Sequence, residues 1–376
     1  MQEKEILCTM ALTRVSYSSL AGLLQLYRTA GSAARIVEYC NDIRELIPHA
    51  HPRLVEALRL ITGEPMRRAE VEYKYNQDHN IEMLCYNDER YPARLRECDD
   101  APVILYYRGV ADLNQRHVIN IIGTRNCTTY GKDLIRRLCE DMRLLCPQLL
   151  IVSGLAYGID ICAHREALRC GYDTVGVVAH GLDDLYPSLH RDTANEMVTH
   201  GGLLSEFMTQ TEPEKRNFVQ RNRIVAGVSD ACLVVESAAK GGALITAGIS
   251  RSYNRDVFAF PGAVGAPRSE GCNNLIRDNK ATLVTCAEDL TNAMGWNENT
   301  LLQPATKDGI ERELFPTLTP EEQQVVSTLQ KNNDLQINML SVQANIPIQK
   351  INATLFGLEM KGVIKTLAGG MYHLIV

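Results

Sequence analysis

Residues 118–125 read VINIIGTR, an apolar run that ends in a turn of small and polar residues. Four later runs share this character: LLIV at 149–152, TVGVV at 174–178, ACLVV at 231–235 and DVFAF at 256–260. Consecutive apolar positions are typical of strands buried on both faces, and helix-like stretches such as 132–146 and 158–170 follow most of the runs. The pattern predicts an α/β core over residues 79–295, with a Rossmann-like, doubly wound and mostly parallel sheet.

The sequence before this core predicts a separate helical domain. Residues 1–78 carry apolar residues at helical spacing, as in LAGLLQLYR and RLVEALRLI, and breaks fall near Gly31 and Pro48. We expect a domain of the SAM or helix-hairpin type.

The sequence after the core predicts a linker and a winged-helix-like domain. Residues 296–317 are polar and include Pro304 and Gly309, which is typical of a linker. Residues 318–376 predict three helices, the first opening at Thr319-Pro320, and a hairpin with Gly369-Gly370 at its tip. This tail holds four Lys and four acidic residues. A helix that reads duplex DNA is usually more basic, so the tail favours protein docking or a weak DNA contact.

Composition excludes several classes of protein. The chain has 376 residues and a formal net charge of -6, and no apolar stretch approaches the ~18 residues that span a membrane. The first ten residues, MQEKEILCTM, lack a signal peptide's apolar segment, and the 12 cysteines form no CxxC pair. The expectation is a cytoplasmic protein with free thiols, no metal site and no cofactor.

Small residues follow the predicted strands at the sheet edge where ligands bind in such folds. The turns include Gly123-Thr124-Arg125, Ser153-Gly154 and Lys240-Gly241-Gly242. Tight turns favour glycine in any case, but several of them at one edge leave backbone amides open to an anion. With the charges of Arg125 and Lys240, they predict a pocket lined for phosphate.

The segment KRNFVQRN, residues 215–222, and the following Arg223 gather four cations around Phe218 and Asn222. A short charge run is often only a solvated helix face. Guanidiniums that pair with phosphates and a ring that stacks on a base are, however, the means by which proteins bind single-stranded nucleic acid.

Sequence motifs of common enzymes are missing. The chain contains no GxGxxG, P-loop, HExxH or GxSxG pattern. His164 is expected to be a packing residue. Asp160 and Asp183 are candidate catalytic carboxylates, but an Asp at a helix start or in a turn more often accepts from backbone amides. The prediction is a protein that is not an enzyme.

The ordered motifs IIGTRNCTTYG, IVSGLAYGID, HGLDDLYP, LLSEF, FVQRNRIVAGVS, GGALITA, FAFPG and GCNNLI closely resemble those of the DNA-processing protein A family (DprA/Smf). The match covers residues 86–285. It implies a protein that binds single-stranded DNA, protects incoming strands during natural transformation (competence), loads the RecA recombinase and forms a homodimer. The motif matches, together with Lys240, give these expected DNA-binding residues: Gly123, Thr124, Arg125, Ser153, Gly154, Phe218, Arg221, Asn222, Arg223, Lys240, Gly242, Thr246 and Asn273.

The sequence departs from the family pattern in four places. Met208 and Val219 replace prolines, which is expected to loosen the loop between Glu206 and Phe218. Tyr157 replaces a frequent Arg, and either weakens one phosphate contact or offers a ring for stacking. Gly241 replaces a Ser.

Two other functions stay open. A nucleoside-monophosphate hydrolase on a related Rossmann-like fold also grips phosphate at a Gly-Gly turn, although the PGGxGTxxE-type segment with its catalytic Glu has no counterpart here. A protein-only adaptor would leave the pocket vestigial, and the intact Arg125 argues against it. The core holds 23 Lys and Arg against 27 Asp and Glu, a net charge of -4, which favours a local groove over a broad duplex-binding surface.

Overall fold

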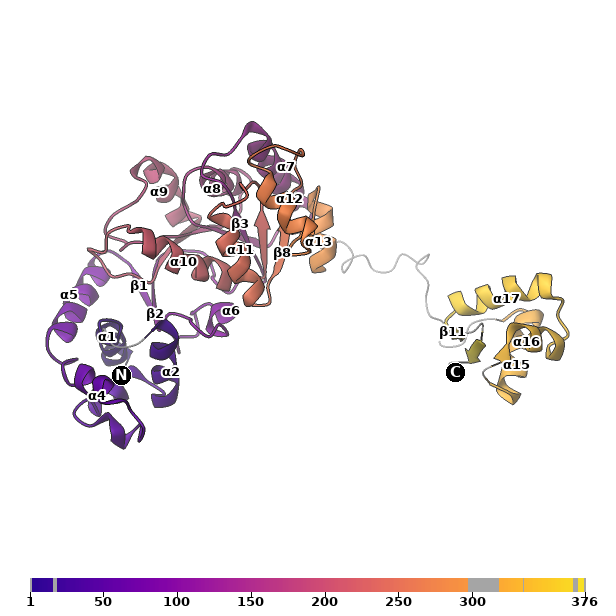
Figure 1. Cartoon of the computed structure of the whole chain (residues 1–376), viewed down its shortest axis with the longest axis horizontal. Coiled ribbons are helices and arrows are strands. Elements are labelled where there is room, and N and C mark those ends of the chain that lie inside the picture. Colours follow the sequence, from indigo (N-terminus) through magenta and orange to yellow (C-terminus); the bar gives the residue numbers. More distant parts are fainter. Residues whose placement is uncertain (1, 16–18, 297–317, 334, 368–370, 375–376) are drawn as a thin grey trace. The chain divides into compact units, whose positions relative to one another are not determined.

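The computed structural model describes residues 2–15, 19–296, 318–333, 335–367 and 371–374 (Figure 1). The chain divides into two compact units, residues 1–299 and 300–376. The predicted linker lies at 297–317 outside the described residues, as does the hairpin tip at Gly369-Gly370. Trp296, predicted to begin the linker, is instead buried in the first unit, where its ring centroid lies 5.0 Å from that of His117.

The first unit is built on a sheet that has nine strands within the described residues, in the order β1-β2-β6-β5-β4-β3-β7-β8-β9. Neighbouring strands from β6 to β9 are all parallel, while β1 and β2 add an antiparallel edge. The mostly parallel α/β core is therefore confirmed. Its strands are β1 Glu82–Cys85, β2 Ile104–Gly109, β3 His117–Ile122, β4 Leu149–Ser153, β5 Thr174–Val177, β6 Gly201–Ser205, β7 Ala231–Val234, β8 Asp256–Ala259 and β9 Thr282–Leu283.

All five predicted strands are present, as β3, β4, β5, β7 and β8. Strand β6 was not predicted, and it opens with two glycines, which have low strand propensity. The packing explains them, because a Cβ at Gly201 would lie 1.9 Å from the Thr174 carbonyl oxygen and one at Gly202 would lie 2.4 Å from the Tyr107 ring. Only glycine lets β6 approach its two neighbours.

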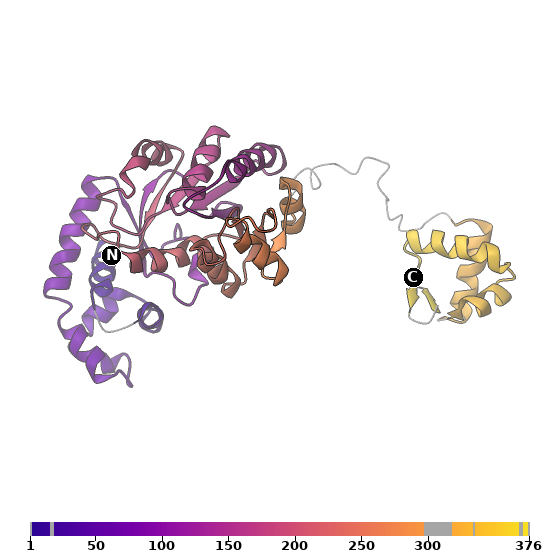
Figure 2. The same cartoon turned by 45° about the horizontal axis from the view of Figure 1, so that its top comes forward.

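Helices cover both faces of the sheet (Figure 2). Ile119 and Ile121 of β3 pack in one cluster with α7, α8 and α13, while Val118 and Ile122 pack in another with α10, α11 and the N-terminal helices. The helices of the first unit are α1 Gln2–Thr13, α2 Leu20–Ala30, α3 Ala33–Glu38, η1 Ile43–Glu45, α4 Pro52–Arg59, α5 Glu64–Asp78, α6 Ala93–Arg96, α7 Thr129–Leu145, α8 Ile159–Arg169, η2 Ser188–His190, α9 Arg191–Thr199, α10 Lys215–Gly227, α11 Ala243–Ser252, α12 Glu270–Arg277 and α13 Ala287–Met294.

The helical region before the sheet shares its core with the sheet. Buried residues of α1 and α2, such as Met10 and Leu24, belong to the same hydrophobic cluster as Leu105 of β2 and Val118 of β3. Burial of these side chains, worth roughly 1.5–3 kcal/mol each, joins the region to the sheet in one compact unit.

The second unit is a small winged-helix fold. Its first helix begins as predicted, because Thr319 and Glu322 form a capping box in which each side chain accepts from the other's backbone N–H. Its three strands pair in the order β10-β12-β11 within the described residues. The elements are α15 Pro320–Lys331, β10 Leu335–Gln336, α16 Ile337–Gln343, α17 Ile348–Met360, β11 Ile364–Leu367 and β12 Met371–Leu374.

Candidate functional site

A cavity of about 280 Å³ lies at the point where the order of the strands in the sheet reverses. The chain leaves β3 toward β4 on one side and later returns to place β7 on the other side of β3. Ligands of open α/β sheets bind at such a switch point, beyond the carboxyl ends of the strands. Nine of the thirteen predicted residues line this switch-point cavity: Gly123, Thr124, Arg125, Gly154, Phe218, Arg221, Asn222, Gly242 and Thr246.

Helix α10 supplies an aromatic ring to the cavity. Phe218 is half-buried, and its ring centroid lies 5.4 Å from the guanidinium carbon of Arg125 and 5.9 Å from that of Arg221. The ring of Tyr186 meets it edge-on at 5.9 Å. Contacts of this kind between cations and rings are worth about 0.5–2 kcal/mol. Phe218 therefore holds Arg125 at the cavity, in addition to the base-stacking role that the sequence predicts.

Arg221 and Asp160 form the buried floor of the site. Arg221 is 4% exposed, and its Nη1 donates to the Val177 carbonyl oxygen at 2.6 Å. Burial lowers the pKa of Arg221 to about 10, against the opposing effect of Asp160. Burial raises the pKa of Asp160. Arg221 and the backbone N–H groups that donate to the Asp160 carboxylate act in the opposite direction and lower it. A Cβ at Gly154 would lie 2.0 Å from Arg221 Nη1, so a larger residue there would displace the guanidinium.

Positive potential in the cavity comes mainly from side chains and one helix end. Two of the backbone N–H groups that were predicted to bind an anion already have acceptors within the protein. Thr124 N donates to the Glu236 carbonyl oxygen at 2.8 Å, and Gly154 N donates to Asp160 at 3.2 Å. The ten-residue helix α11 begins at the cavity wall at Gly242-Ala243 and has no side-chain cap. An uncapped helix N-terminus beside two arginines attracts an anion.

Arg223 is corrected from a phosphate ligand to a structural residue. It is 4% exposed, forms an ion pair with the buried Glu206 and donates to the Asp100 carbonyl oxygen. The helix explains the difference, since two residues along an α-helix are about 200° apart and Arg223 faces away from Arg221. The composition of KRNFVQRNR therefore overstates the charge available to a ligand.

Three other predicted residues are also absent from the cavity wall. The Ser153 hydroxyl is buried and donates to the Ile121 carbonyl oxygen at 2.6 Å. The side-chain amide of Asn273 accepts from the Gly262 backbone N–H at 3.1 Å and donates to the Gly262 carbonyl oxygen at 3.0 Å. These two hydrogen bonds fix the turn after β8. Lys240 is exposed on the turn beside the cavity.

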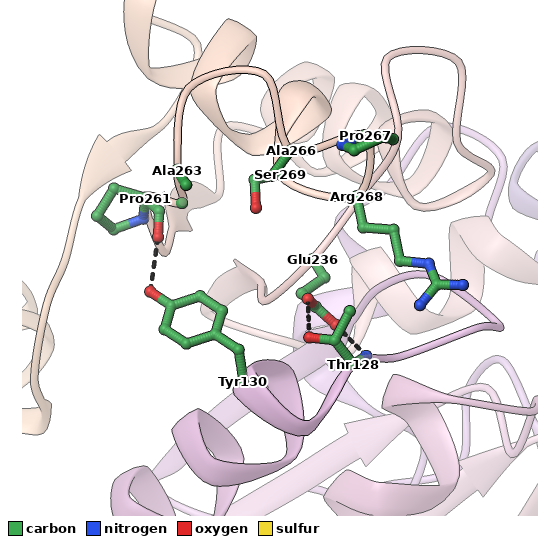
Figure 3. A pocket seen from close by; sticks show the side chains of 10 residues that line it. Thr128, Tyr130, Glu236, Pro261, Ala263, Ala266, Pro267, Arg268 and Ser269 are labelled. Carbon is green, nitrogen blue, oxygen red and sulfur yellow. Dashed lines mark hydrogen bonds between the residues drawn. The ribbon is translucent and has the colours of Figure 1, made fainter.

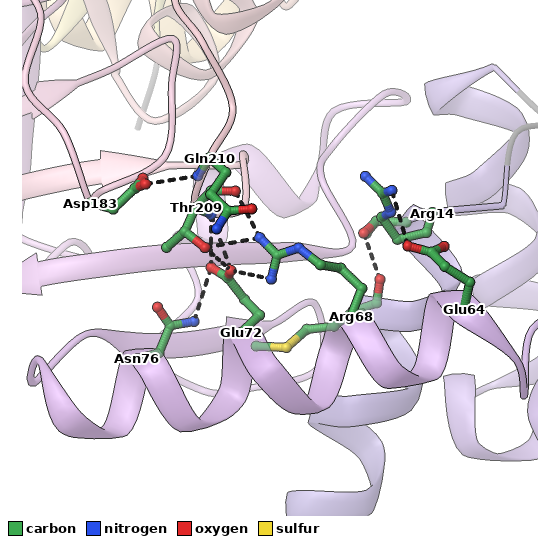
Figure 4. Close-up of polar contacts among 10 residues, drawn as sticks. Arg14, Glu64, Arg68, Glu72, Asn76, Asp183, Thr209 and Gln210 are labelled. Carbon is green, nitrogen blue, oxygen red and sulfur yellow. Dashed lines mark hydrogen bonds and ion pairs between the residues drawn. The ribbon is translucent and has the colours of Figure 1, made fainter.

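A polar clamp that the sequence did not predict holds the loop before α10 (Figure 4). Glu72 of α5 is 1% exposed, pairs with Arg68 at 2.9 Å and accepts from the backbone N–H and hydroxyl of Thr209. Met208 is 7% exposed in the adjoining core. The loop is therefore anchored beside Met208, and the loosening expected from the loss of the prolines stays a prediction. Sequence could show Arg68 and Glu72 at i,i+4 spacing, but their partner lies 137 residues away.

The remaining candidates have structural roles. His164 is fully buried and its ring forms a hydrogen bond with the Thr174 hydroxyl, as expected for a packing residue. Burial lowers the pKa of His164 to about 3. Asp160 and Asp183 accept from the backbone amides of Gly154 and Gln210, as expected. The Tyr157 ring packs edge-on against His190 at 5.0 Å and is not part of the cavity wall.

The described part of the chain has no cluster of three His, Cys, Asp or Glu side chains placed to hold a metal ion. None of its helices is long and apolar enough to cross a membrane.

Comparisons with known proteins show the family of the chain. The family model of DNA recombination-mediator protein A matches residues 82–295, and that of the DprA winged helix domain matches residues 312–370. Protein Smf of Escherichia coli is 30% identical over 319 residues, which is 82% of each chain. DprA of Streptococcus pneumoniae is 37% identical over 203 residues, or 54% of this chain and 71% of that protein. The match to Smf of Synechocystis, 36% identical, spans 64% of this chain and 59% of the relative's length.

Two solved structures are also similar. The crystal structure of S. pneumoniae DprA aligns with a TM-score of 0.64 at 28% identity, over 75% of this chain and 95% of that one. A structure of DNA processing protein A from Helicobacter pylori, described for its single-stranded DNA binding mode, aligns with a TM-score of 0.52 at 28% identity, over 57% and 95%. The chain therefore belongs to the DNA recombination-mediator protein A family, which includes the DNA-processing proteins DprA and Smf.

Proposed function

We propose that this protein binds single-stranded DNA through the switch-point cavity and acts as a recombination mediator. The observation that carries the proposal is the convergence of Arg125, Arg221 and the uncapped start of α11 on one cavity of about 280 Å³. That volume admits a phosphate with part of a nucleotide rather than a duplex. In this role Arg125 pairs with a phosphate as a bidentate donor, and Arg221 adds charge from beneath.

Three further residues complete the proposed binding site. Phe218 presents a ring at the cavity, and stacking on a ring requires an unpaired base. Asn222, half-buried beside it, reads a base edge or supports the helix. Thr246 lies one turn into α11 and offers a hydroxyl to the same phosphate.

The wider role rests on family membership. We infer a protein of the cytoplasm that protects single strands during natural transformation, acts as a homodimer and loads a RecA-type recombinase. Chemistry on the bound strand is not part of the proposal. Asp160, the only carboxylate on the described cavity wall, is occupied with backbone amides and Arg221, unlike the catalytic carboxylate of a nucleoside-monophosphate hydrolase.

A titration with labelled oligonucleotides tests the proposal. The protein is mixed with single-stranded and double-stranded oligonucleotides of equal length at several salt concentrations. We expect at least about tenfold tighter binding of single strands, because the stacking contact is lost in a duplex. Equal affinity for both forms would contradict the cavity as the binding site.

The function class needs a second assay. The protein should speed assembly of the cognate recombinase on strands that a single-strand-binding protein already coats. Release of free base from nucleoside monophosphates, without any such stimulation, would support the hydrolase instead.

A further inference from the structure

A second and larger cavity lies beside the first at the same edge of the sheet. Figure 3 shows the residues that line it. It has a volume of about 830 Å³, within the range of small-molecule sites. Its walls follow β3, β7 and β8, which are neighbours in the sheet, whereas those of the switch-point cavity follow β4, β3 and β7. The residues that line this proline-lined cavity are Thr128, Tyr130, Glu236, Pro261, Gly262, Ala263, Ala266, Pro267, Arg268 and Ser269.

The two cavities are joined by short stretches of chain. Gly123–Arg125 line the first cavity, and Thr128 and Tyr130, a few residues on, line the second. After β7, Glu236 belongs to the second and Ser237 to the first. A strand whose phosphate lies at Arg125 therefore has its next nucleotide within reach of the second cavity.

The floor of the second cavity is a carboxylate. Glu236 is 2% exposed, and it accepts the Thr128 hydroxyl at 2.5 Å and the Thr128 backbone N–H at 2.8 Å. This places a negative charge at the N-terminus of α7, where the helix dipole stabilises it. The carboxylate repels a phosphate, so the N-terminus of α7 is occupied by Glu236 and is not open to a phosphate. A carboxylate has about four acceptor positions, so it can still accept N–H groups from a ligand.

The walls suit a flat apolar group. The Tyr130 ring is 47% exposed, and its hydroxyl donates to the Pro261 carbonyl oxygen at 2.8 Å, which fixes the ring at the cavity. Two prolines and two alanines from the loop after β8 form the other wall. Arg268 is exposed on the same loop, and Figure 3 shows it on the other side of Glu236 from Tyr130.

We propose that this cavity is a nucleobase subsite, which takes a base of the strand whose phosphate lies at Arg125. The proposal rests on the proposed function. Tyr130 stacks on the base, Glu236 accepts from its amino group, and Arg268 neutralises the adjoining phosphate. The amino groups of cytosine, adenine and guanine suit the carboxylate, and Glu is a common acceptor for the cytosine amino group. Thymine offers its N–H only between two carbonyl oxygens, which a carboxylate repels.

Photo-cross-linking of the full chain tests where the base lies. Single strands carry one 5-iodocytosine at successive positions, and the cross-linked peptides are identified by mass spectrometry. We expect one position to cross-link to the peptide that contains Tyr130, and Tyr130→Leu to remove that product. Cross-links that never reach this peptide would overturn the subsite.

Affinity measurements give an independent test. Tyr130→Ala and Arg268→Ala should each weaken binding of an oligonucleotide that spans both cavities by about fivefold or more. Arg251→Ala is the matched control, because Arg251 is exposed in the last turn of α11, at the opposite edge of the sheet. Glu236→Gln should reduce a preference for oligo-dC over oligo-dT, and fluorescence of the buried Trp296 reports whether each variant is folded.

The outcomes separate this proposal from the proposed function. If the wild-type protein binds no single strand, both fail. If it binds, and Arg125→Ala weakens binding while Tyr130→Ala and Arg268→Ala bind like wild type, the switch-point cavity stands and the subsite is overturned. A basic side chain of a partner protein then becomes the ligand that the Glu236 carboxylate fits.

Discussion

Helices α10 and α17 have the same length of 13 residues but differ in the charge of their side chains. Helix α10 carries four cations, and α17, the third helix of the winged-helix unit, carries one, Lys350. Large apolar side chains are also exposed on α17: Phe356 is 66% exposed and Met360 56%. A helix that enters a groove of duplex DNA usually presents Arg and Lys to phosphates and base edges. The comparison therefore supports the proposal that DNA binds at the sheet edge, and it favours a protein contact for α17.

The same comparison shows that the number of cations on a helix is a poor measure of its binding capacity. Of the cations of α10, Arg221 lies at the switch-point cavity, Arg223 pairs with Glu206 inside the protein, and Arg216 is 84% exposed and pairs with Glu214. Arg125, from a different element, completes the site. Position around the helix, rather than charge, decides which cations are available to a ligand. The predictions below test this division.

The largest expected effect is on stability. Arg223→Ala leaves the buried Glu206 carboxylate without its cation, which should lower the free energy of unfolding by roughly 3–5 kcal/mol. Denaturant unfolding followed by Trp296 fluorescence measures it. Arg216→Ala on the exposed side of α10 is the control and should change stability by less than about 1 kcal/mol. Equal stability of the two variants would return Arg223 to the list of DNA ligands.

Next in size is the effect of Arg125 on DNA affinity. Arg125→Ala removes a charge-assisted contact worth roughly 1.5–3 kcal/mol, so affinity for single strands should fall by about ten- to hundredfold. The slope of log affinity against log salt should become shallower by about 0.7, as expected for one phosphate. Arg251→Ala should leave both quantities unchanged. A folded Arg125→Ala protein with wild-type affinity would mean that Arg125 is structural.

The clamp before α10 should have an intermediate effect. Glu72→Ala leaves Arg68 and the Thr209 backbone N–H without their buried acceptor, which costs about 1–3 kcal/mol. We expect lower stability and faster proteolysis between Glu206 and Phe218. Glu70→Ala, an exposed position on the same helix, is the matched control. If both variants resist protease like wild type, the loop does not depend on α5.

The smallest effect concerns the winged-helix unit. A protein that ends at Leu302 should keep its affinity for single strands within about twofold, because the described cations of the tail are few and Lys361 pairs with Glu322 at 2.6 Å. The same titration measures it. A large loss of affinity in the folded, truncated protein would make the tail a DNA-binding module and break the comparison.

Local patterns in the sequence predicted the α/β class and the central strands of the sheet. Uninterrupted apolar runs predicted the central parallel strands, and the Thr319-Pro320 signal placed the start of α15 correctly, because both depend on neighbours in the chain. The turns after β3, β4 and β7 could be assigned to one sheet edge because parallel strands end together. The antiparallel edge, β6 and the two-residue strand β9 were missed. The reason is clear for β6, since its glycines are favourable only against Thr174 and Tyr107.

Tertiary structure decided which residues of the site are free to act. By itself the sequence predicted Arg125, Phe218, Arg221 and the glycine turns as site residues, because side-chain chemistry and turn propensity are local properties. It could not separate Arg221 from Arg223, whose partners Val177 and Glu206 lie far away in the chain. Nor could it place Glu72 on Thr209, or bring Tyr130, Glu236 and Arg268 around one cavity. Burial and hydrogen bonding between distant segments set the charge and exposure of each group, and only the folded chain brings those segments together.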